Sequence, residues 1–444
     1  MLERAHADAQ QPLRTVQRRS PVVLDAHDLG PLDARFKAVP VGAWGRDAAE
    51  FTATRPGLAD LPTPLVTLDA RALATNVATL RAWARDVGVD LAPHGKTTMA
   101  PAVWRAQLDA GALGLTVATG WQLTVALREG LDWVMAAYPV LDPGVLRWLA
   151  QPRTSRVLVW ADDVATVAAM APHVRGAAQP LDVLVELGGL GGRTGARSTA
   201  AAVEVARAVR ATPGLRLAGV AGYEGAFAHD ASPASLTVVR TYLHDLAGLH
   251  RRLLAEDLYP PVPGGVVVTA GGSAYFDAVA DVLAGLHDPA GGVRVVVRAG
   301  AYVAHDDGFY RGITPVDRLD DAGPLRAAAH GWARVVSRPE PGLALADAGK
   351  RDLPFDEGLP EVQAVRRGGH ADTTPLEGAE VTALNDQHAF VRFPPELDLR
   401  VGDVLRLGLS HPCTTFDKWG LLPVVDDALA PQPVLVDWVR TVFG

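Results

Sequence analysis

The chain has 444 residues, 48% of them hydrophobic, so it can bury a large core, which we expect to be divided between two domains. Its net charge of −8 argues against a nucleic-acid partner, and it contains no apolar run of roughly eighteen residues that could cross a membrane. The single cysteine, Cys413, excludes an intrachain disulfide, and the N-terminus lacks the apolar stretch of a secretory signal, so we expect a cytoplasmic protein.

Residues 1–60 show no strong periodicity, and we assign them to an N-terminal arm whose packing the sequence does not determine. A short strand is expected at 63–69. Asp69 at its end is a suitable N-cap for the amphipathic helix that we expect to follow.

From there, apolar runs of strand length alternate with Ala- and Leu-rich segments that are long enough for helices. The eight runs lie at 89–91, 115–118, 133–138, 157–160, 183–187, 215–221, 266–269 and 293–297. This alternation predicts a (β/α)8 TIM-like barrel, which we assign to residues 61–318. An open doubly wound sheet is the alternative, but its G-x-G-x-x-G turn is not found after an early strand.

After about residue 318 the pattern changes to short strands separated by Pro- and Gly-rich turns. We expect strands at 331–337, 343–347, 380–384, 389–393 and 404–409, and short helical-looking stretches near 362–367 and 434–442. Residues 319–444 are therefore predicted to form a smaller, mainly β C-terminal domain.

Lys96 stands out because the chain has only four lysines, while arginine is frequent. An amine can form a Schiff base, whereas a guanidinium stays protonated, so a lysine retained against this bias suggests chemistry. Lys96 also follows a strand, which places it on the C-terminal face of the barrel, where active sites collect. The neighbouring His94 could equally be a catalytic group or an ordinary loop histidine.

Two turns after the last barrel strands could hold a phosphate. Gly271, Gly272 and Ser273 follow the seventh strand and offer backbone N–H groups and a hydroxyl, and the turn from Arg298 through Gly300 to Tyr302 follows the eighth. A phosphate site between these two loops is common in barrels. Together with Lys96, these turns are the parts that a pyridoxal phosphate site requires.

The C-terminal domain contains a candidate metal pair, His411 and Cys413. On an extended segment, residues i and i+2 point to the same side, so both side chains could reach one ion. The alternative is a buried cysteine beside a chance histidine, and the spacing alone does not decide between them. Two protein ligands would leave positions for water and substrate, as in a catalytic zinc site.

From about residue 62 to 426 the chain resembles the fold-type III pyridoxal phosphate enzymes, specifically the family of D-serine dehydratase and D-threonine aldolase, whose barrel is alanine racemase-like. Pro93-His94-Gly95-Lys96-Thr97 is similar to the family's P-H-x-K-T motif, which puts Lys96 in the place of the Schiff-base lysine. The Gly-rich segment 186–195 resembles the family's D-x-G-x-x-R-x-G stretch without its leading Asp.

The resemblance implies roles for further residues. Arg193 would contact the cofactor ring, Tyr223 lies in a segment similar to the family's Tyr-x-Gly, and His229 would occupy the place of an aldolase base. His411-x-Cys413 is similar to the dehydratase metal pair, whereas aldolases of this family more often show His-x-Asp. The cofactor-binding set expected in this way is Lys96, Arg193, Tyr223, Gly271, Gly272, Ser273, Gly300 and Tyr302.

The resemblance therefore implies a homodimeric lyase that uses pyridoxal 5'-phosphate and Zn2+, or another divalent metal such as Mn2+ or Mg2+, on a small D-3-hydroxy amino acid. We expect D-serine dehydratase-type elimination to a 2-oxo acid and ammonia. The alternative is D-threonine aldolase-type cleavage to glycine and an aldehyde. A non-catalytic pyridoxal phosphate protein is a more remote alternative, and racemisation would need a second base that the sequence does not locate.

Overall fold

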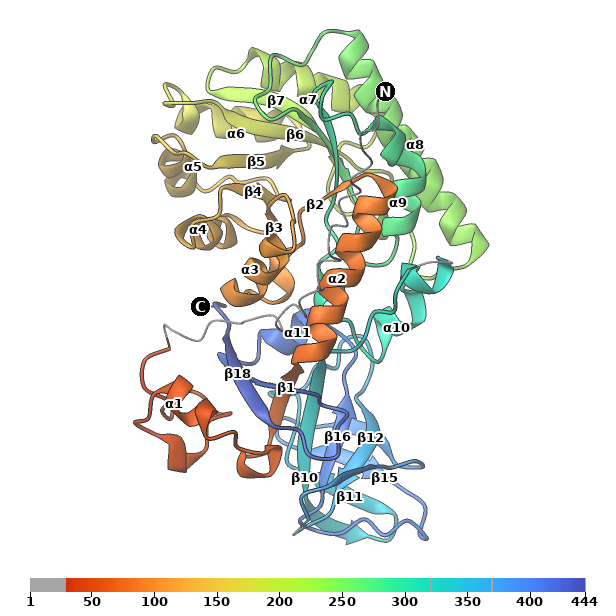
Figure 1. Cartoon of the computed structure of the whole chain (residues 1–444). Coiled ribbons are helices and arrows are strands. Elements are labelled where there is room, and N and C mark those ends of the chain that lie inside the picture. Colours follow the sequence, from red (N-terminus) through yellow and green to blue (C-terminus); the bar gives the residue numbers. More distant parts are fainter. Residues whose placement is uncertain (1–28, 320–321, 369, 444) are drawn as a thin grey trace, which may run out of the picture.

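A computed structural model describes residues 29–319, 322–368 and 370–443. The expected N-terminal arm lies outside the described residues as far as residue 28. The chain forms two bodies: a barrel of parallel strands with helices outside it, and a smaller body of antiparallel strands (Figure 1). No helix in the described ranges is both long and apolar enough to span a membrane.

The barrel consists of eight parallel strands in the order β2-β9-β8-β7-β6-β5-β4-β3. Their bounds are β2 Asp90–Leu91, β3 Leu115–Val117, β4 Trp133–Ala136, β5 Arg156–Ala161, β6 Leu181–Leu187, β7 Leu215–Gly222, β8 Val266–Ala270 and β9 Val293–Val297. The first and last strands of this order meet, because the N–H groups of Leu113 and Thr116 donate to the carbonyls of Leu91 and Pro93 at 2.7 and 2.8 Å. The predicted barrel is thus confirmed.

One helix precedes β2 and others follow most of the barrel strands, and together they cover the outside of the barrel. They are α2 Ala70–Val87, α3 Pro101–Asp109, α4 Gly120–Arg128, α5 Pro143–Leu149, α6 Val164–Val174, α7 Thr199–Ala211, α8 Pro233–Ala255 and α9 Phe276–Leu283. The predicted N-cap of α2 is present, since the Asp69 carboxylate accepts from the Ala72 N–H at 2.8 Å.

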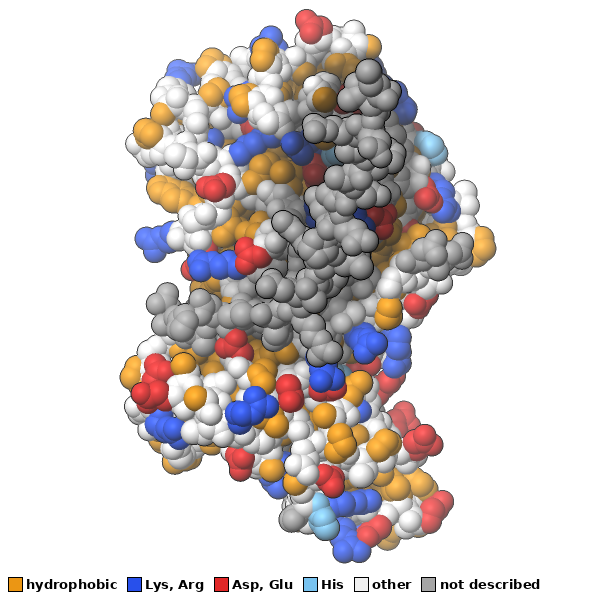
Figure 2. Space-filling model, in the orientation of Figure 1, with side chains coloured by type: hydrophobic (Ala, Val, Ile, Leu, Met, Phe, Trp, Pro, Cys, Tyr) orange, Lys and Arg blue, Asp and Glu red, His pale blue; other side chains and the backbone are white. Residues whose placement is uncertain are grey.

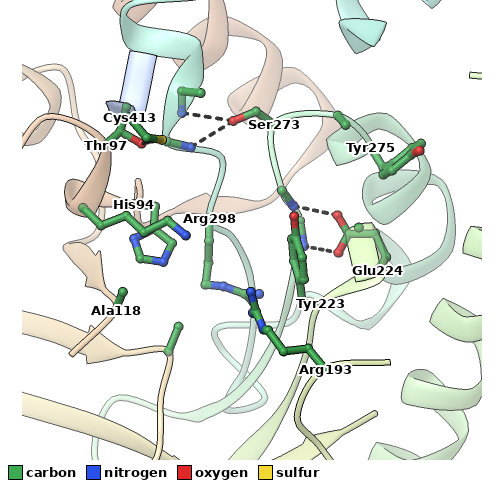
Figure 3. Close-up of a pocket in the computed structure, with 18 of the residues that line it drawn as sticks. His94, Thr97, Ala118, Arg193, Tyr223, Glu224, Ser273, Tyr275, Arg298 and Cys413 are labelled. Atoms are coloured by element: carbon green, nitrogen blue, oxygen red, sulfur yellow. Dashed lines mark hydrogen bonds between the residues drawn. The ribbon is translucent and has the colours of Figure 1, made fainter. Parts of the chain in front are cut away.

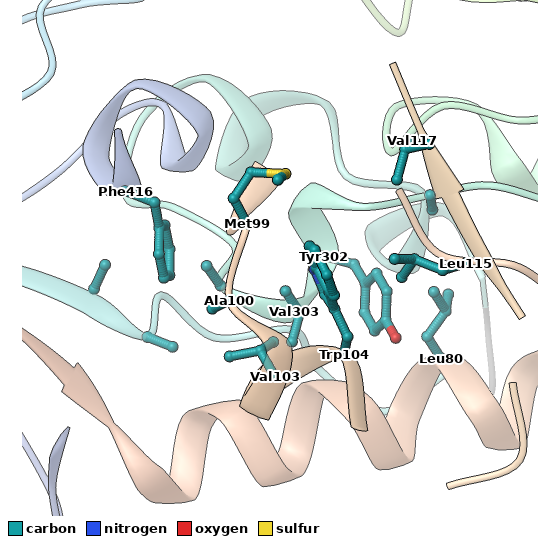
Figure 4. Packing of buried hydrophobic residues seen from close by; sticks show 14 of the residues in the cluster. Leu80, Met99, Ala100, Val103, Trp104, Leu115, Val117, Tyr302, Val303 and Phe416 are labelled. Atoms are coloured by element: carbon teal, nitrogen blue, oxygen red, sulfur yellow. The ribbon is translucent and has the colours of Figure 1, made fainter. Parts of the chain in front are cut away.

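Apolar side chains fill both the barrel interior and the layer between strands and helices. Figure 4 shows part of the outer layer, where Leu80 of α2 and Trp104 of α3 pack with Tyr302 and Val303. Phe416 of the second body belongs to the same cluster. Because side chains of both bodies belong to one cluster, the two bodies share a continuous core. Burial of each large side chain in it contributes roughly 1.5–3 kcal/mol to stability.

The second body is mainly β, as expected. Its strands are β1 Leu65–Asp69, β10 Ala329–Glu340, β11 Leu343–Ala346, β12 Glu361–Arg366, β13 Thr373–Pro375, β14 Glu380–Leu384, β15 Ala389–Arg392, β16 Val404–Gly408, β17 Leu421–Val425 and β18 Leu435–Arg440. The order β13-β12-β16-β10-β1-β17-β18 forms the main path, and β11, β15 and β14 extend from β10. The two helical-looking stretches are the strands β12 and β18.

The sheet topology differs from the expected boundary at residue 61, because β1 belongs to the second body. It pairs antiparallel with β10 and parallel with β17, and the helix before it, α1 (Ala48–Ala53), contacts β18. All five residues of β1 are buried. A strand buried on both faces shows no alternation, so its sequence cannot tell which sheet it joins.

Candidate active site

A cavity of about 540 Å3 lies at the C-terminal ends of the barrel strands, where the second body closes against them. The sequence-predicted residues that line it are His94, Lys96, Arg193, Tyr223, His229, Gly271, Gly272, Ser273, Gly300, His411 and Cys413. Figure 3 shows the side chains from both bodies that converge there. Of the predicted site residues, Tyr302 is not among those that line the cavity.

Lys96 lies in a short 3-10 turn, η3 (Gly95–Thr97), and its side chain is accessible from the cavity. The turn is pressed against α3: a Cβ on Gly95 would come within 2.8 Å of Trp104 Nε1, which donates to the Gly95 carbonyl at 3.2 Å. Burial by the cavity walls lowers the pKa of the Lys96 amine from its ordinary value; Cys413 opposes this shift, and Arg193 adds to it. The site therefore makes this amine less basic than that of a free lysine.

His94 lies beside Lys96 and its Nδ1 is buried without a hydrogen-bond partner among the described residues. Burial, followed by the positive charges of Lys96, Arg298 and Arg193, holds the pKa of this imidazole well below its ordinary value. A buried polar atom without a partner is costly, so a group bound in the cavity that supplied a partner to His94 Nδ1 would remove this cost.

Arg298 directly follows β9; the sequence placed it at the start of the second predicted turn but gave it no role of its own. It is 4% exposed, donates to Thr269 Oγ1 at 2.6 Å and to the Gly222 carbonyl at 2.7 Å, and lies over the Trp160 ring at 4.9 Å. Burial lowers the pKa of its guanidinium. The residue thus places a fixed positive charge in the cavity wall, and its position directly after a barrel strand was the available signal.

Arg193 and Tyr223 lie together beside Arg298 in the cavity wall, with the Arg193 guanidinium carbon 5.1 Å from the centroid of the Tyr223 ring (Figure 3). The Tyr223 N–H donates to the Tyr242 hydroxyl at 3.0 Å, which in turn donates to the Leu187 carbonyl at 2.6 Å. These bonds tie the ends of β6 and β7 together, whereas His229 lies exposed at the rim.

The two turns predicted to hold a phosphate both reach the cavity, but their amides already have partners within the protein. Ser273 Oγ accepts from the N–H groups of Gly300 and Ala301 at 3.3 and 3.0 Å, so a hydroxyl and two amides meet at one corner (Figure 3). The N–H groups of Gly271 and Gly272, expected to face a phosphate, instead donate to the carboxylate of Glu224. This partner could not be inferred locally, because it comes from the end of another strand.

Tyr302 does not lie where the sequence placed it. Its side chain is 2% exposed in the core of Figure 4, and its hydroxyl accepts a hydrogen bond from Gln107 Nε2 at 2.9 Å. It belongs to the 3-10 turn η6 (Ala301–Val303), whose first residue, Ala301, lines the cavity. The turn was therefore placed correctly, but its tyrosine points into the core.

His411 and Cys413 both line the cavity, although their segment is not extended. Pro412 starts a short helix, α11 (Pro412–Phe416), which has His411 as its N-cap and Cys413 in its first turn. The assumption of a strand was thus wrong, because Pro at the first helical position favours a helix start. Cys413 Sγ lies 3.4 Å from Thr97 Oγ1, next to Lys96.

Asp356 orients the imidazole of His411. Its Oδ2 lies 2.6 Å from His411 Nδ1, and its Oδ1 accepts from Thr414 Oγ1 at 2.7 Å, which leaves His411 Nε2 for another partner. Burial alone would lower the pKa of His411, but Cys413 and Asp356 raise it to about 9. Conversely, burial would raise the pKa of the Cys413 thiol, but His411 and Thr97 bring it below its ordinary value.

The donor chemistry suits zinc, because imidazole nitrogen and thiolate sulfur are its preferred ligands, while Mg2+ and Mn2+ favour oxygen. Within the described ranges, no group of three or more His, Cys, Asp or Glu side chains could hold a metal. For pyridoxal phosphate, the Lys96 amine, the Ser273 corner and the unpartnered His94 Nδ1 also fit the group.

Two family models match this chain. The model of the alanine racemase N-terminal domain matches residues 68–262, and that of the serine dehydratase domain matches residues 328–425. D-threonine aldolase of Arthrobacter sp. is 29% identical over 383 residues, which cover 84% of this chain and 92% of that protein. D-threo-3-hydroxyaspartate dehydratase of Delftia sp. is 26% identical over 385 residues, covering 81% and 92%.

Among solved structures, D-threonine aldolase from Filomicrobium marinum superposes with a TM-score of 0.70 at 25% identity, over 86% of this chain and 97% of that one. Both matched domains and these relatives agree with the fold described above. The chain therefore belongs to the D-serine dehydratase and D-threonine aldolase family of fold-type III pyridoxal phosphate enzymes, and it is a lyase of D-hydroxy amino acids.

Proposed function

We propose that this lyase uses pyridoxal phosphate on Lys96 and zinc on His411 and Cys413 to dehydrate a D-3-hydroxy amino acid such as D-serine. The observation that carries the proposal is the His411 and Cys413 pair on α11, which reaches the same cavity as Lys96, with Cys413 Sγ 3.4 Å from Thr97 Oγ1. A thiolate ligand distinguishes this pair from the His-x-Asp that we associate with aldolases.

At the cofactor end of the cavity, the N–H groups of Gly300 and Ala301 donate to Ser273 Oγ, and a phosphate could take over these two amides and accept from the Ser273 hydroxyl. Arg193 is available to the ring, and Lys96 to the carbonyl carbon. Pyridoxal phosphate, when bound, withdraws electrons from the bonds at Cα of the substrate.

The residues of the chain supply the proton transfers. With its lowered pKa, the Lys96 amine can take the proton from Cα. His411 and Cys413 would hold zinc, whose positive charge would favour departure of the β-hydroxyl. The released 2-aminoacrylate then hydrolyses to pyruvate and ammonia, so water is lost from D-serine and regained in the last step.

A second candidate is retro-aldol cleavage of the Cα–Cβ bond, as in D-threonine aldolase. His229 favours it, because it lines the cavity rim and could take the proton of the β-hydroxyl. Two of the relatives above, from Arthrobacter sp. and Filomicrobium marinum, are D-threonine aldolases.

The deciding experiment incubates the purified enzyme with D-serine and with D-threonine, with and without a metal chelator. We expect pyruvate and 2-oxobutyrate, and their loss on chelation with recovery when zinc is added. Glycine and acetaldehyde from D-threonine would establish the aldolase instead. Undiminished activity after complete metal removal would contradict the role of His411 and Cys413.

A further inference from the structure

Glu224 is a buried carboxylate that the proposed function does not use. It follows β7 in the 3-10 turn η4 (Glu224–Ala226), and its side chain is 0% exposed. Its Oε2 accepts from the Gly271 N–H at 2.9 Å and its Oε1 from the Gly272 N–H at 2.6 Å (Figure 3). Both oxygens are thus used on two successive amides of the turn after β8.

The glycine turn leaves little room for another arrangement. Gly271 has φ +102°, a conformation that side-chain-bearing residues rarely adopt, and a Cβ there would lie 3.0 Å from Val297 Cγ1. A Cβ on Gly272 would lie 3.0 Å from Tyr223 Cε2. The backbone therefore runs close to its neighbours, and its two N–H groups need a buried acceptor, which Glu224 provides.

The next residue in this turn is Ser273, whose hydroxyl meets the N–H groups of Gly300 and Ala301. Its position depends on the backbone that Glu224 holds one residue earlier. The amides of Gly271 and Gly272 are held by a buried carboxylate, whose negative charge keeps a phosphate away from them. The amides of Gly300 and Ala301 donate only to the neutral Ser273 hydroxyl, which a phosphate can replace as acceptor, and the hydrogen of that hydroxyl is a further donor.

We propose that Glu224 is a positioning residue for the phosphate group of the cofactor. By holding the Gly271 and Gly272 amides, it fixes Ser273 opposite Gly300 and Ala301, where these groups can surround a phosphate monoester. This inference rests on the proposed function, because it assumes that the cavity binds pyridoxal phosphate.

The test compares pyridoxal phosphate with pyridoxal, which lacks the phosphate, by absorbance titration of the metal-loaded full chain after removal of the cofactor. In Glu224→Gln one carboxylate oxygen is replaced by an NH2 group, which cannot accept a hydrogen bond. One of the two backbone N–H groups of the glycine turn then has no acceptor. We expect the dissociation constant for pyridoxal phosphate to rise at least about tenfold. The constant for pyridoxal should change less than about twofold, because pyridoxal makes no contact with the turn.

The matched control is Glu186→Gln. Glu186 is also a buried carboxylate at the end of a barrel strand, but it accepts from Thr194 Oγ1 and not from the glycine turn. It should leave the ratio of the two dissociation constants unchanged. Glu224→Asp, which keeps the carboxylate one methylene shorter, should give an intermediate ratio and serves as the second variant where the Gln form folds poorly.

Equal weakening of both ligands in the Glu224 variants would overturn the inference and leave a purely structural role. An unchanged ratio in a folded variant would overturn it as well. Failure of the proposed function would give a different result. The enzyme without any substitution would then show no visible absorbance band that is lost in Lys96→Ala when pyridoxal phosphate is added.

Discussion

The two halves of the active site are built differently. In the barrel half, two charged side chains are buried and hydrogen-bonded to the ends of the strands, namely Arg298 at 4% exposure and Glu224 at 0%. In the half that comes from the second body, the side chains of His411 and Asp356 are 21% and 41% exposed and depend on each other across 2.6 Å. The barrel half would therefore be formed before a cofactor binds. In the other half, a bound metal would itself hold the His411 and Cys413 side chains in place.

This difference has a functional consequence. Interior hydrogen bonds such as those of Arg298 and Glu224 are not exposed to competition from water, so they keep the barrel half in one arrangement. The half that comes from the second body, with the proposed metal ligands His411 and Cys413, is called the metal half below. It is held by α11, which packs against η3 beside Lys96. Cofactor binding should therefore survive changes at the metal half, while catalysis should require both.

The largest effect is expected from Lys96→Ala, which removes the amine from the barrel half. Activity should fall at least about a thousandfold, because both the covalent attachment and the Cα base are lost. The visible absorbance of the bound cofactor should disappear, while zinc content stays at the level of the unmodified enzyme. Lys350→Ala, which removes an exposed lysine beside Phe355, is the control. A retained visible band would contradict the assignment of Lys96.

Cys413→Ala should break the metal half alone. We expect activity to fall about a hundredfold or more, with zinc lost and the visible cofactor band retained. The two measurements, metal analysis and an absorbance spectrum on one preparation, separate the halves directly. Loss of the cofactor together with zinc would show that the barrel half is not formed independently.

A smaller effect is expected from Asp356→Asn, which leaves the histidine and cysteine in place. The carboxylate no longer accepts from His411 Nδ1, so zinc affinity should fall roughly 10- to 100-fold, as for other carboxylates that orient a metal-bound histidine. Competition with a chelating dye measures this without any turnover. Asp417→Asn, in a carboxylate that pairs with Lys418 at 3.6 Å, should leave zinc affinity unchanged. An equal loss in both variants would indicate only a general charge effect.

The fold was largely predictable, because most barrel strands are mainly apolar runs bounded by turn residues. Lys96 could be recognised as a rare residue after a strand, and the glycine turns, the His-x-Cys pair and the resemblance located ten further residues of the cavity lining. The N-terminal strand β1 was placed in the wrong body, since a fully buried strand carries no signal of its partners.

Residues that act through distant partners could not be predicted. Glu224 meets the glycine turn 47 residues further on, and Asp356 meets His411 across 55 residues. Neither stands in a local pattern that suggests its partner, because only the folded chain brings the strand ends and α11 together. Asp356 and Glu224 look like ordinary acidic residues in the sequence.

The smallest effect on cofactor affinity is expected from a substitution of Tyr302, whose turn lines the cavity while its ring lies in the core. This substitution tests whether the barrel half binds the cofactor without the Tyr302 hydroxyl. Tyr302→Phe removes the hydroxyl that accepts from Gln107 Nε2, and Gln107 is only 4% exposed. Unfolding in urea should show a loss of about 1–3 kcal/mol from the unpaired amide. Cofactor affinity should stay within about twofold, whereas Ser273→Ala, at the neighbouring phosphate corner, should weaken it about tenfold. A tenfold loss in Tyr302→Phe would mean that the hydroxyl reaches the cofactor after all.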